Sequence, residues 1–147
     1  MHRWLFLVFL VVACRAPGET PSASTPPAKR VEIDKTTQTL RAYEGDRLVF
    51  QSRISTGKWD KSTPNGHFAA GGKERMHYSR LFKNAPMPYS VEVTGDVFIH
   101  GFSSVPRQPA SHGCIRLPLA GDNPAKRFYE WVEYGTPIEI TGRWEGR

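Results

Sequence analysis

Short apolar runs separated by turn residues dominate the chain after residue 30. Apolar and polar residues alternate loosely over residues 31–34 and 39–43, and residues 48–56 are rich in Val, Phe and Ile, so three strands are expected there. Residues 44–46, Glu-Gly-Asp, are typical of the turn between the second and the third strand. The pattern predicts a small antiparallel sheet at the start of the folded part.

More short strands are expected further along the chain. They are predicted over residues 67–70, 91–93, 97–100, 115–117 and 137–141. Residues 71–84 show no regular pattern and contain basic and aromatic residues, so we expect an irregular loop there. Two interpretations of this loop stay open: a lid that gives cationic contacts to an anionic substrate, or an exposed loop whose charges keep it soluble.

One segment has the pattern of an α-helix. Asn123 is the expected N-cap, Pro124 the first helical residue, and Gly135 follows the expected end. The residues of its apolar face are Ala125, Phe128 and Val132. Many short strands with one helix on the C-terminal side predict a mostly β domain, a β-sandwich or barrel-like sheet.

Residues 1–14 have the features of an export signal. His2 and Arg3 give a short positive flank, and residues 4–13 form an apolar run too short to span a bilayer comfortably as a helix. The final Val-Val-Ala-Cys, ending at Cys14, resembles a bacterial lipobox, in which the cysteine becomes the lipidated first residue of the mature protein. We therefore expect a lipoprotein signal peptide; ordinary secretion and an uncleaved anchor remain the alternatives.

Residues 15–30 change to Pro, Ser, Thr, Ala and Gly. A segment of this composition cannot bury a core, and in an extended polyproline-like state it would reach up to about 50 Å at roughly 3.1 Å per residue. The sequence therefore predicts a Pro/Ser/Thr-rich linker over 15–30 and a folded domain over 31–142.

The charge balance of the whole chain limits the possible partners. The 147 residues have room for one small domain, and 20 Lys and Arg against 14 Asp and Glu give a formal charge of +6. Such a balance fits nucleic acid, an anionic membrane, an anionic polymer such as cell wall, or a solvated basic surface. There is no run of five basic residues and no nucleic-acid-binding motif, so we do not expect nucleic acid as a partner.

The residues that carry candidate chemistry lie between positions 99 and 116. Cys114 is the only cysteine besides Cys14, and a thiol attacks a carbonyl as its thiolate, which an imidazole can generate by taking the proton. Of the two nearby histidines, His100 is favoured as the base, because a residue from another strand can be oriented independently of the nucleophile. Gly113 has no side chain, so backbone N–H groups at Gly113 and Cys114 are candidate oxyanion donors.

Simpler interpretations apply to the same residues. A lone cysteine is often a small buried hydrophobic residue, and a lone histidine is often structural. Two histidines and Cys114 suggest zinc, but a structural zinc site needs four ligands and the other cysteine lies in the leader, so no metal is expected. With Cys14 lipidated and Cys114 kept as a thiol, no disulfide is expected either.

The motif around these residues resembles the catalytic signature of the YkuD-type L,D-transpeptidases. It consists of His100-Gly101, a spacer, and then Ser111-His112-Gly113-Cys114 followed by an aliphatic residue and an Arg. The spacer, residues 102–110, is slightly short and lacks the glycine usually seen before the second element. Further segments similar to the family are residues 31–34, 39–43, 55–58, 63–66, 87–89 and 134–138.

The resemblance implies acyl transfer on peptidoglycan stem peptides by residues 31–142 as an L,D-transpeptidase catalytic domain. Cys114, deprotonated by His100, would attack the carbonyl on the L-centre of a diaminopimelate residue and expel the terminal D-Ala. The amine of a second stem would then resolve the thioester and give a 3→3 cross-link. The Gly101 carbonyl is expected to orient His100, and His112 to shape the site.

Three further residues are expected at the substrate: Arg116, Ser111 and Tyr89. Arg116 either holds a substrate carboxylate or forms a structural salt bridge under the active-site loop. Ser111 either hydrogen-bonds a histidine or the substrate, or stabilises the turn. Tyr89 belongs to the Met-Pro-Tyr segment that is similar to the family. No cofactor is expected.

The acceptor stays open at this stage. Water in place of the amine would make the protein an L,D-carboxypeptidase, and a lysine of another lipoprotein would make it an anchoring enzyme. A wall-binding lipoprotein without activity is the non-enzymatic alternative. In each case the expected partners are peptidoglycan and, through the lipid, a membrane, and the expected location is the cell envelope, facing the periplasm or the cell wall.

Overall fold

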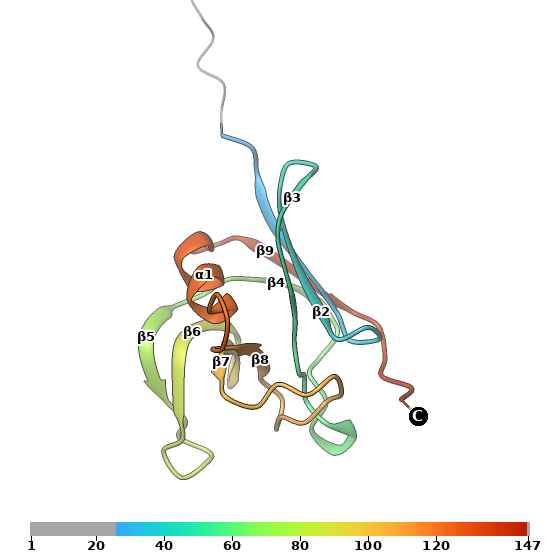
Figure 1. Cartoon of the computed structure of the whole chain (residues 1–147), viewed down its shortest axis with the longest axis vertical. Coiled ribbons are helices and arrows are strands. Elements are labelled where there is room, and N and C mark those ends of the chain that lie inside the picture. The colour runs from blue at the N-terminus through green and yellow to red at the C-terminus, as the bar shows by residue number, and fades with distance from the viewer. Residues whose placement is uncertain (1–25, 147) are drawn as a thin grey trace, which may run out of the picture.

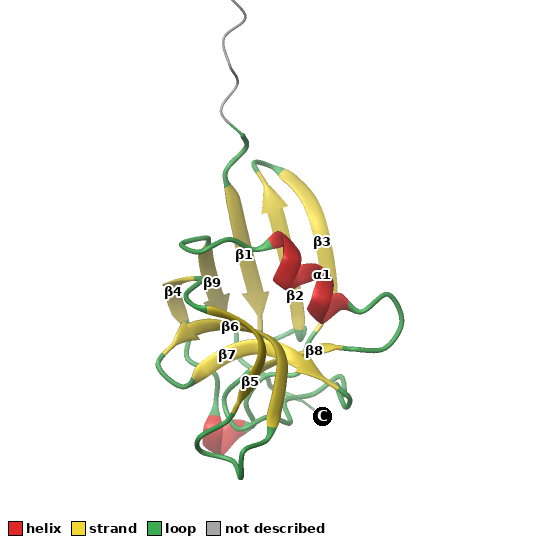
Figure 2. Cartoon of the chain, turned by 90° about the vertical axis from the view of Figure 1, so that its left-hand side faces the viewer, coloured by secondary structure: helices red, strands yellow, loops and turns green. Residues whose placement is uncertain are grey.

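The computed structural model describes residues 26–146, which form two β-sheets, an α-helix and a 3₁₀-helix (Figures 1 and 2). The first sheet has the strand order β3-β2-β1-β9-β4. Its strands are β1 (Lys29–Asp34), β2 (Thr39–Glu44), β3 (Arg47–Arg53), β4 (Gly66–Ala69) and β9 (Pro137–Thr141). Strand β1 pairs in parallel with β9, so the first and the last strand of the domain are neighbours in this sheet.

The second sheet has the order β5-β6-β7-β8 and positions the candidate chemistry. Its strands are β5 (Lys73–Tyr78), β6 (Pro86–Thr94), β7 (Val97–Phe102) and β8 (Ile115–Pro118). Strands β7 and β8 are parallel, with His100 paired to Arg116. The connection between them, residues 103–114, carries the predicted nucleophile to the start of β8.

The core lies between the two sheets and under helix α1 (Pro124–Trp131). Alternation along the strands buries Ile33 and Leu40 of the first sheet and Ile99 and Ile115 of the second, each at most 1% exposed. Helix α1 packs against β6, β7 and β8, and its fully buried Phe128 has its ring 6.3 Å from that of Phe50 on β3. The predicted mostly β sandwich with one C-terminal-side helix is therefore confirmed.

The start and the buried face of the helix agree with the sequence pattern. The Asn123 side chain accepts a hydrogen bond from the Lys126 backbone N–H at 3.0 Å, and Pro124 is the first helical residue. The three apolar positions expected on one face, Ala125, Phe128 and Val132, are all buried. The helix ends at Trp131.

The expectation of an irregular loop over residues 71–84 is wrong for its first half. Residues 73–78 form strand β5, which pairs antiparallel with β6. This strand lies at the edge of its sheet and no residue in it is fully buried, so its sequence lacks the apolar–polar alternation that identifies a strand. Strand β6 is also longer than residues 91–93, because it begins at Pro86.

The predictions for the N-terminal part lie mostly outside the described residues. The signal peptide with Cys14 falls outside them, as does the linker up to residue 25. Of the remaining linker positions, Lys29 and Arg30 already belong to β1. Within residues 26–146, no helix combines the length and the apolar character needed to span a membrane.

Replacing Phe128 with alanine is expected to lower the free energy of unfolding by about 3–5 kcal/mol, because it removes a fully buried ring and leaves a cavity between α1 and the sheets. Chemical denaturation measures this loss. The matched control is Tyr134→Ala, since that ring is 84% exposed and its removal should change the stability by less than about 0.5 kcal/mol. Equal stability of both variants would contradict the described core.

Candidate active site

The candidate chemistry lies on the outer face of the second sheet. Side chains alternate along β7, so Ile99 faces the core while Phe98, His100 and Phe102 line a cavity on the other face. Arg116, the partner of His100 in β8, lines the same cavity. The β-sheet register thus brings residues from two separate sequence motifs to one surface.

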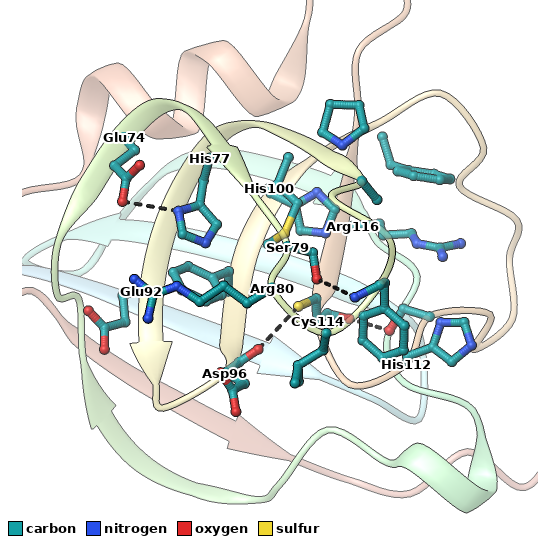
Figure 3. A pocket seen from close by; sticks show the side chains of 18 of the residues that line it. Glu74, His77, Ser79, Arg80, Glu92, Asp96, His100, His112, Cys114 and Arg116 are labelled. Carbon is teal, nitrogen blue, oxygen red and sulfur yellow. Dashed lines mark hydrogen bonds and ion pairs between the residues drawn. The ribbon is translucent and has the colours of Figure 1, made fainter.

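The cavity has a volume of about 450 Å³ and opens beneath the hairpin that joins β5 to β6. His100, Arg116 and Cys114 lie together in its central part (Figure 3). The residues that line it are Gly72, Glu74, His77, Ser79, Arg80, Leu81, Phe82, Ala85, Pro86, Met87, Glu92, Gly95, Asp96, Phe98, His100, Phe102, Ser111, His112, Cys114 and Arg116. A volume of this size accepts a short peptide segment.

His100 is held as a neutral base. Its Nδ1 lies 2.9 Å from the Gly101 carbonyl oxygen, and a carbonyl can only accept, so Nδ1 carries the proton and Nε2 is left as the acceptor nitrogen. Burial lowers the pKa of His100 to about 4, against the opposing effect of this hydrogen bond. The predicted contact between Gly101 and His100 is therefore present, and the imidazole can take up a proton at neutral pH.

Cys114 is a neutral thiol in this structure. Burial raises the pKa of its thiol, although a backbone hydrogen bond at Phe98 and the positive charge of Arg116 act in the opposite direction. The Sγ atom donates to the Asp96 carbonyl oxygen at 3.6 Å, and among the described residues no hydrogen bond joins it to His100. A reaction at this thiol must therefore begin with transfer of its proton.

A short turn over residues 111–114, which we call the nucleophile turn, positions Cys114, the predicted nucleophile. Ser111 is buried; its hydroxyl donates to the Cys114 carbonyl and accepts from the Gly113 N–H at 3.1 Å. Of the two interpretations of Ser111, stabilisation of the turn is the one that these contacts support. The oxyanion role of Gly113 stays a prediction, and it requires the Gly113 N–H to exchange Ser111 for a substrate oxygen.

Thr63 anchors the turn from behind and was not recognised as a site residue from the sequence. Its hydroxyl donates to the Gly113 carbonyl at 2.7 Å and accepts from the Gly57 N–H at 2.9 Å. A Cβ at Gly57 would lie 2.0 Å from the Lys61 carbonyl oxygen and 2.9 Å from Cα of Gly113, so only glycine allows this approach. The Thr-Pro-Asn-Gly segment therefore supports the nucleophile turn.

Thr63→Val is expected to lower the free energy of unfolding by about 1–3 kcal/mol, because the isosteric side chain leaves the Gly57 N–H and the Gly113 carbonyl without their buried partner. Chemical denaturation tests this. Thr141→Val, at an exposed position of β9, is the control and should be nearly neutral. If the two variants were equally stable, Thr63 would have no role in holding the turn.

His112 and Arg116, two further predicted residues, differ in exposure: His112 is exposed and Arg116 is half-buried. His112 is exposed at the cavity rim, where its ring stacks on Phe82 with 4.5 Å between centroids. The Arg116 guanidinium lies over the Phe102 ring at 4.1 Å, and no carboxylate of residues 26–146 forms a salt bridge with it. The alternative of a structural salt bridge is thus not seen among the described residues, and the role of Arg116 at the substrate stays a prediction.

Tyr89 is not among the residues that line the cavity, and its expected contact with substrate stays a prediction. It packs against the core, and its ring lies 5.8 Å from that of Tyr129 on α1. Tyr89 also has a positive φ of 56°, an uncommon conformation for a residue with a large side chain. This turns the strand locally.

Several cavity residues come from β5 and β6 and were not identified as site residues from the sequence. His77 stacks on Phe98 with 4.7 Å between centroids, and its Nδ1 lies 3.0 Å from the Glu74 carboxylate. Glu92 and Asp96 add two more carboxylates to the lining. The positions of Glu74 and His77 depend on the pairing of β5 with β6, and β5 has no clear strand pattern in the sequence, while Asp96 lies in the turn between β6 and β7.

The described geometry can be compared with known proteins. The L,D-transpeptidase catalytic domain (YkuD) family matches residues 28–140. A comparison with curated proteins found no match. Because the family match covers most of the chain, this protein belongs to the YkuD family of L,D-transpeptidase catalytic domains.

Solved structures give the same result. An L,D-transpeptidase (Yku) from Stackebrandtia nassauensis is 26% identical with a TM-score of 0.73, covering 82% of this chain and 58% of its own. One from Xylanimonas cellulosilytica is 30% identical with a TM-score of 0.67, covering 83% of this chain and 64% of its own. The transpeptidase LdtMt1, solved in complex with imipenem, is 27% identical with a TM-score of 0.68, covering 78% and 59%. The chain thus spans less than two thirds of the length of each of these structures.

Proposed function

We propose that this protein is a cysteine-dependent L,D-transpeptidase that forms 3→3 cross-links between peptidoglycan stems. The observation that carries the proposal is the joint placement of Cys114 and His100, from separate motifs, in one cavity of a domain of this family. Arg116 brings a positive charge to the same cavity that can bind a substrate carboxylate.

The first half-reaction uses the neutral thiol and the neutral imidazole. The Cys114 thiol breaks its hydrogen bond to the Asp96 carbonyl and gives its proton to Nε2 of His100. Its Sγ then bonds to the carbonyl carbon on the L-centre of diaminopimelate. The bond from that carbon to the nitrogen of the terminal D-Ala then breaks. The departing amine takes the proton back from His100, and a thioester remains on Cys114.

The second half-reaction returns the enzyme to its starting state. The amine of a second stem attacks the thioester carbon and gives a proton to His100, which passes it to the departing sulfur of Cys114. Within a stem, the D-centre of diaminopimelate carries a free ammonium and a free carboxylate. The cavity offers both complements, because Glu74, Glu92 and Asp96 provide negative charge while Arg116 provides positive charge.

Mass spectrometry of the products tests the proposal. The purified protein is incubated with diaminopimelate-containing tetrapeptide stems, and the matched control is the tripeptide stem, which has no D-Ala to expel. Loss of D-Ala with formation of a cross-linked dimer is expected from the tetrapeptide alone. If the tetrapeptide is converted to tripeptide without any dimer, the protein is instead an L,D-carboxypeptidase. If the folded protein forms no product at all, the proposal is overturned for this substrate.

The cellular setting is part of the same proposal. The lipobox-like segment ending at Cys14 supports a lipoprotein anchored in the cell envelope, with the linker giving the domain reach toward the wall. Metabolic labelling with a fatty-acid analogue tests this, since Cys14→Ala should remove the label. An acceptor lysine on another lipoprotein remains the second candidate activity, because the acyl-enzyme would be the same.

A further inference from the structure

A second hollow lies behind the nucleophile turn, and we call it the rear groove. Its volume is about 640 Å³. It is lined by Lys35, Thr56, Gly57, Lys58, Trp59, Ser62, Asn65, Gln108, Pro109, Gly142, Arg143 and Trp144. The 3₁₀-helix η1 (Trp59–Lys61) and the C-terminal end contribute to it, and both lie at the end of the molecule opposite the start of β1 (Figures 1 and 2).

The rear groove and the active-site cavity share a wall. Gly57 lines the groove and forms a β-bridge with Ser111, which lines the cavity. The Lys58 N–H donates to the Ser111 carbonyl at 3.1 Å on the same bridge. No residue lines both hollows, so the groove is a separate surface that lies directly behind the turn carrying Cys114.

All charged side chains that line the rear groove are basic. Lys35, Lys58 and Arg143 line it, and no Asp or Glu does. Lys35 is only 7% exposed, and its Nζ donates to the neutral Thr63 carbonyl at 2.6 Å and faces the Ser62 hydroxyl at 3.4 Å. No carboxylate of residues 26–146 forms a salt bridge with this ammonium, and burial lowers its pKa. A buried cation without a counter-ion favours an anionic ligand in the groove.

Two tryptophans give the rear groove large apolar surfaces. Trp59 is 92% exposed and Trp144 is 38% exposed. Exposing an indole to water is unfavourable, and a large exposed aromatic side chain beside a hollow is typical of a binding surface. Asn65 and Gln108 add amide groups that can donate and accept. Pyranose rings stack their C–H faces on such indoles, while their hydroxyl and N-acetyl groups bond to amides.

We propose that the rear groove binds the glycan strand of peptidoglycan, an amino-sugar polymer whose attached stems carry carboxylates. This choice of polymer rests on the proposed function, whereas the anionic saccharide chemistry rests on the groove itself. The tryptophans take the sugar rings, and Lys58 and Arg143 take the carboxylates. Since the groove lies behind the nucleophile turn, the enzyme holds the wall polymer on both sides of Cys114.

Co-sedimentation with purified sacculi tests the proposal on the full chain in detergent. The double variant Lys58→Ala/Trp59→Ala should bind sacculi at least about tenfold more weakly, which is the effect of losing one aromatic and one cationic anchor. The matched control, Arg53→Ala/Tyr134→Ala, removes the same charge and an equally exposed ring at other places and should bind like the wild type. Undiminished binding of the groove variant would overturn the proposal.

A second measurement identifies the ligand class. In calorimetric titrations the wild type should bind a disaccharide–peptide fragment of peptidoglycan more tightly than chitotetraose, which is neutral, and the groove variant should lose this preference. Binding to phosphatidylglycerol vesicles that depends on Lys58 and Trp59, without binding of the fragment, would assign the groove to a membrane surface and overturn the proposal.

The two proposals fail separately. Release of D-Ala from a soluble tetrapeptide should be unchanged in Lys58→Ala/Trp59→Ala, because this small substrate has no glycan to place in the groove. If neither the wild type nor the groove variant releases D-Ala, but the groove variant binds sacculi more weakly than the wild type, the proposed function fails and the groove assignment stands. If D-Ala is released normally and sacculus binding does not depend on the groove, the reverse holds.

Discussion

Under the proposed function, Cys114→Ala is expected to abolish acylation by imipenem and to lower D-Ala release from tetrapeptide stems by about 10⁴-fold or more, as removal of a nucleophile generally does. The thiol is the only cysteine in the described residues and lies in the cavity beside the neutral imidazole of His100. A transpeptidase related in sequence and fold has been solved in complex with imipenem. Intact-protein mass spectrometry reports the adduct directly.

The chain offers its own control for this experiment. Cys14→Ala removes the only other cysteine of the chain and should leave the imipenem adduct in place. Because the Cys114 side chain is only partly buried and its hydrogen bond to the Asp96 carbonyl is long, its replacement by alanine should not unfold the domain. An adduct that persists in Cys114→Ala, or disappears in Cys14→Ala, would contradict the assignment of the nucleophile.

The segments of the fold that could be predicted are those with a clear local pattern. The helix was predicted because Asn123, Pro124 and the spacing of Phe128 and Val132 are all local features. Strand β5 was missed because an edge strand with both faces near solvent can consist of polar residues, and its hydrogen bonds come from β6. Local patterns therefore identify elements that bury one face and miss those held only by a neighbour.

The candidate site shows the same division. Cys114 and His100 were proposed from the sequence because they belong to compact motifs, whereas Thr63 and Asp96 contact Gly113 and the Cys114 thiol from other segments through hydrogen bonds. A motif also gives no information on which face of the strand a side chain occupies, and Tyr89 packs toward Tyr129 of α1. The family resemblance predicted the reaction and its residues. Their positions relative to one another follow from the register of the strands, which the structure shows.

His100→Gln is expected to slow acylation of Cys114 by about 10²–10⁴-fold, because glutamine fills the space but cannot accept a proton. The pH dependence should change as well. In the wild type, His100 stays neutral down to its pKa of about 4, so the rate should be flat between pH 5 and 7 and fall near pH 4. In the variant only the thiolate reacts, so the rate should rise roughly tenfold per pH unit below the raised pKa of the thiol.

Stability against pH provides the independent readout for the same variant. The unfolded chain binds a proton at the ordinary histidine pKa of 6.5, while the folded chain resists protonation of His100 down to about 4. The wild type should therefore lose stability as the pH falls from about 6.5 to 4, and His100→Gln should lose less. Denaturant midpoints at pH 7 and pH 5 measure the difference. Two results would show that His100 is not the buried neutral base. One is a wild-type acylation rate that falls near pH 6.5, and the other is an equal pH dependence of the denaturant midpoints of the wild type and His100→Gln.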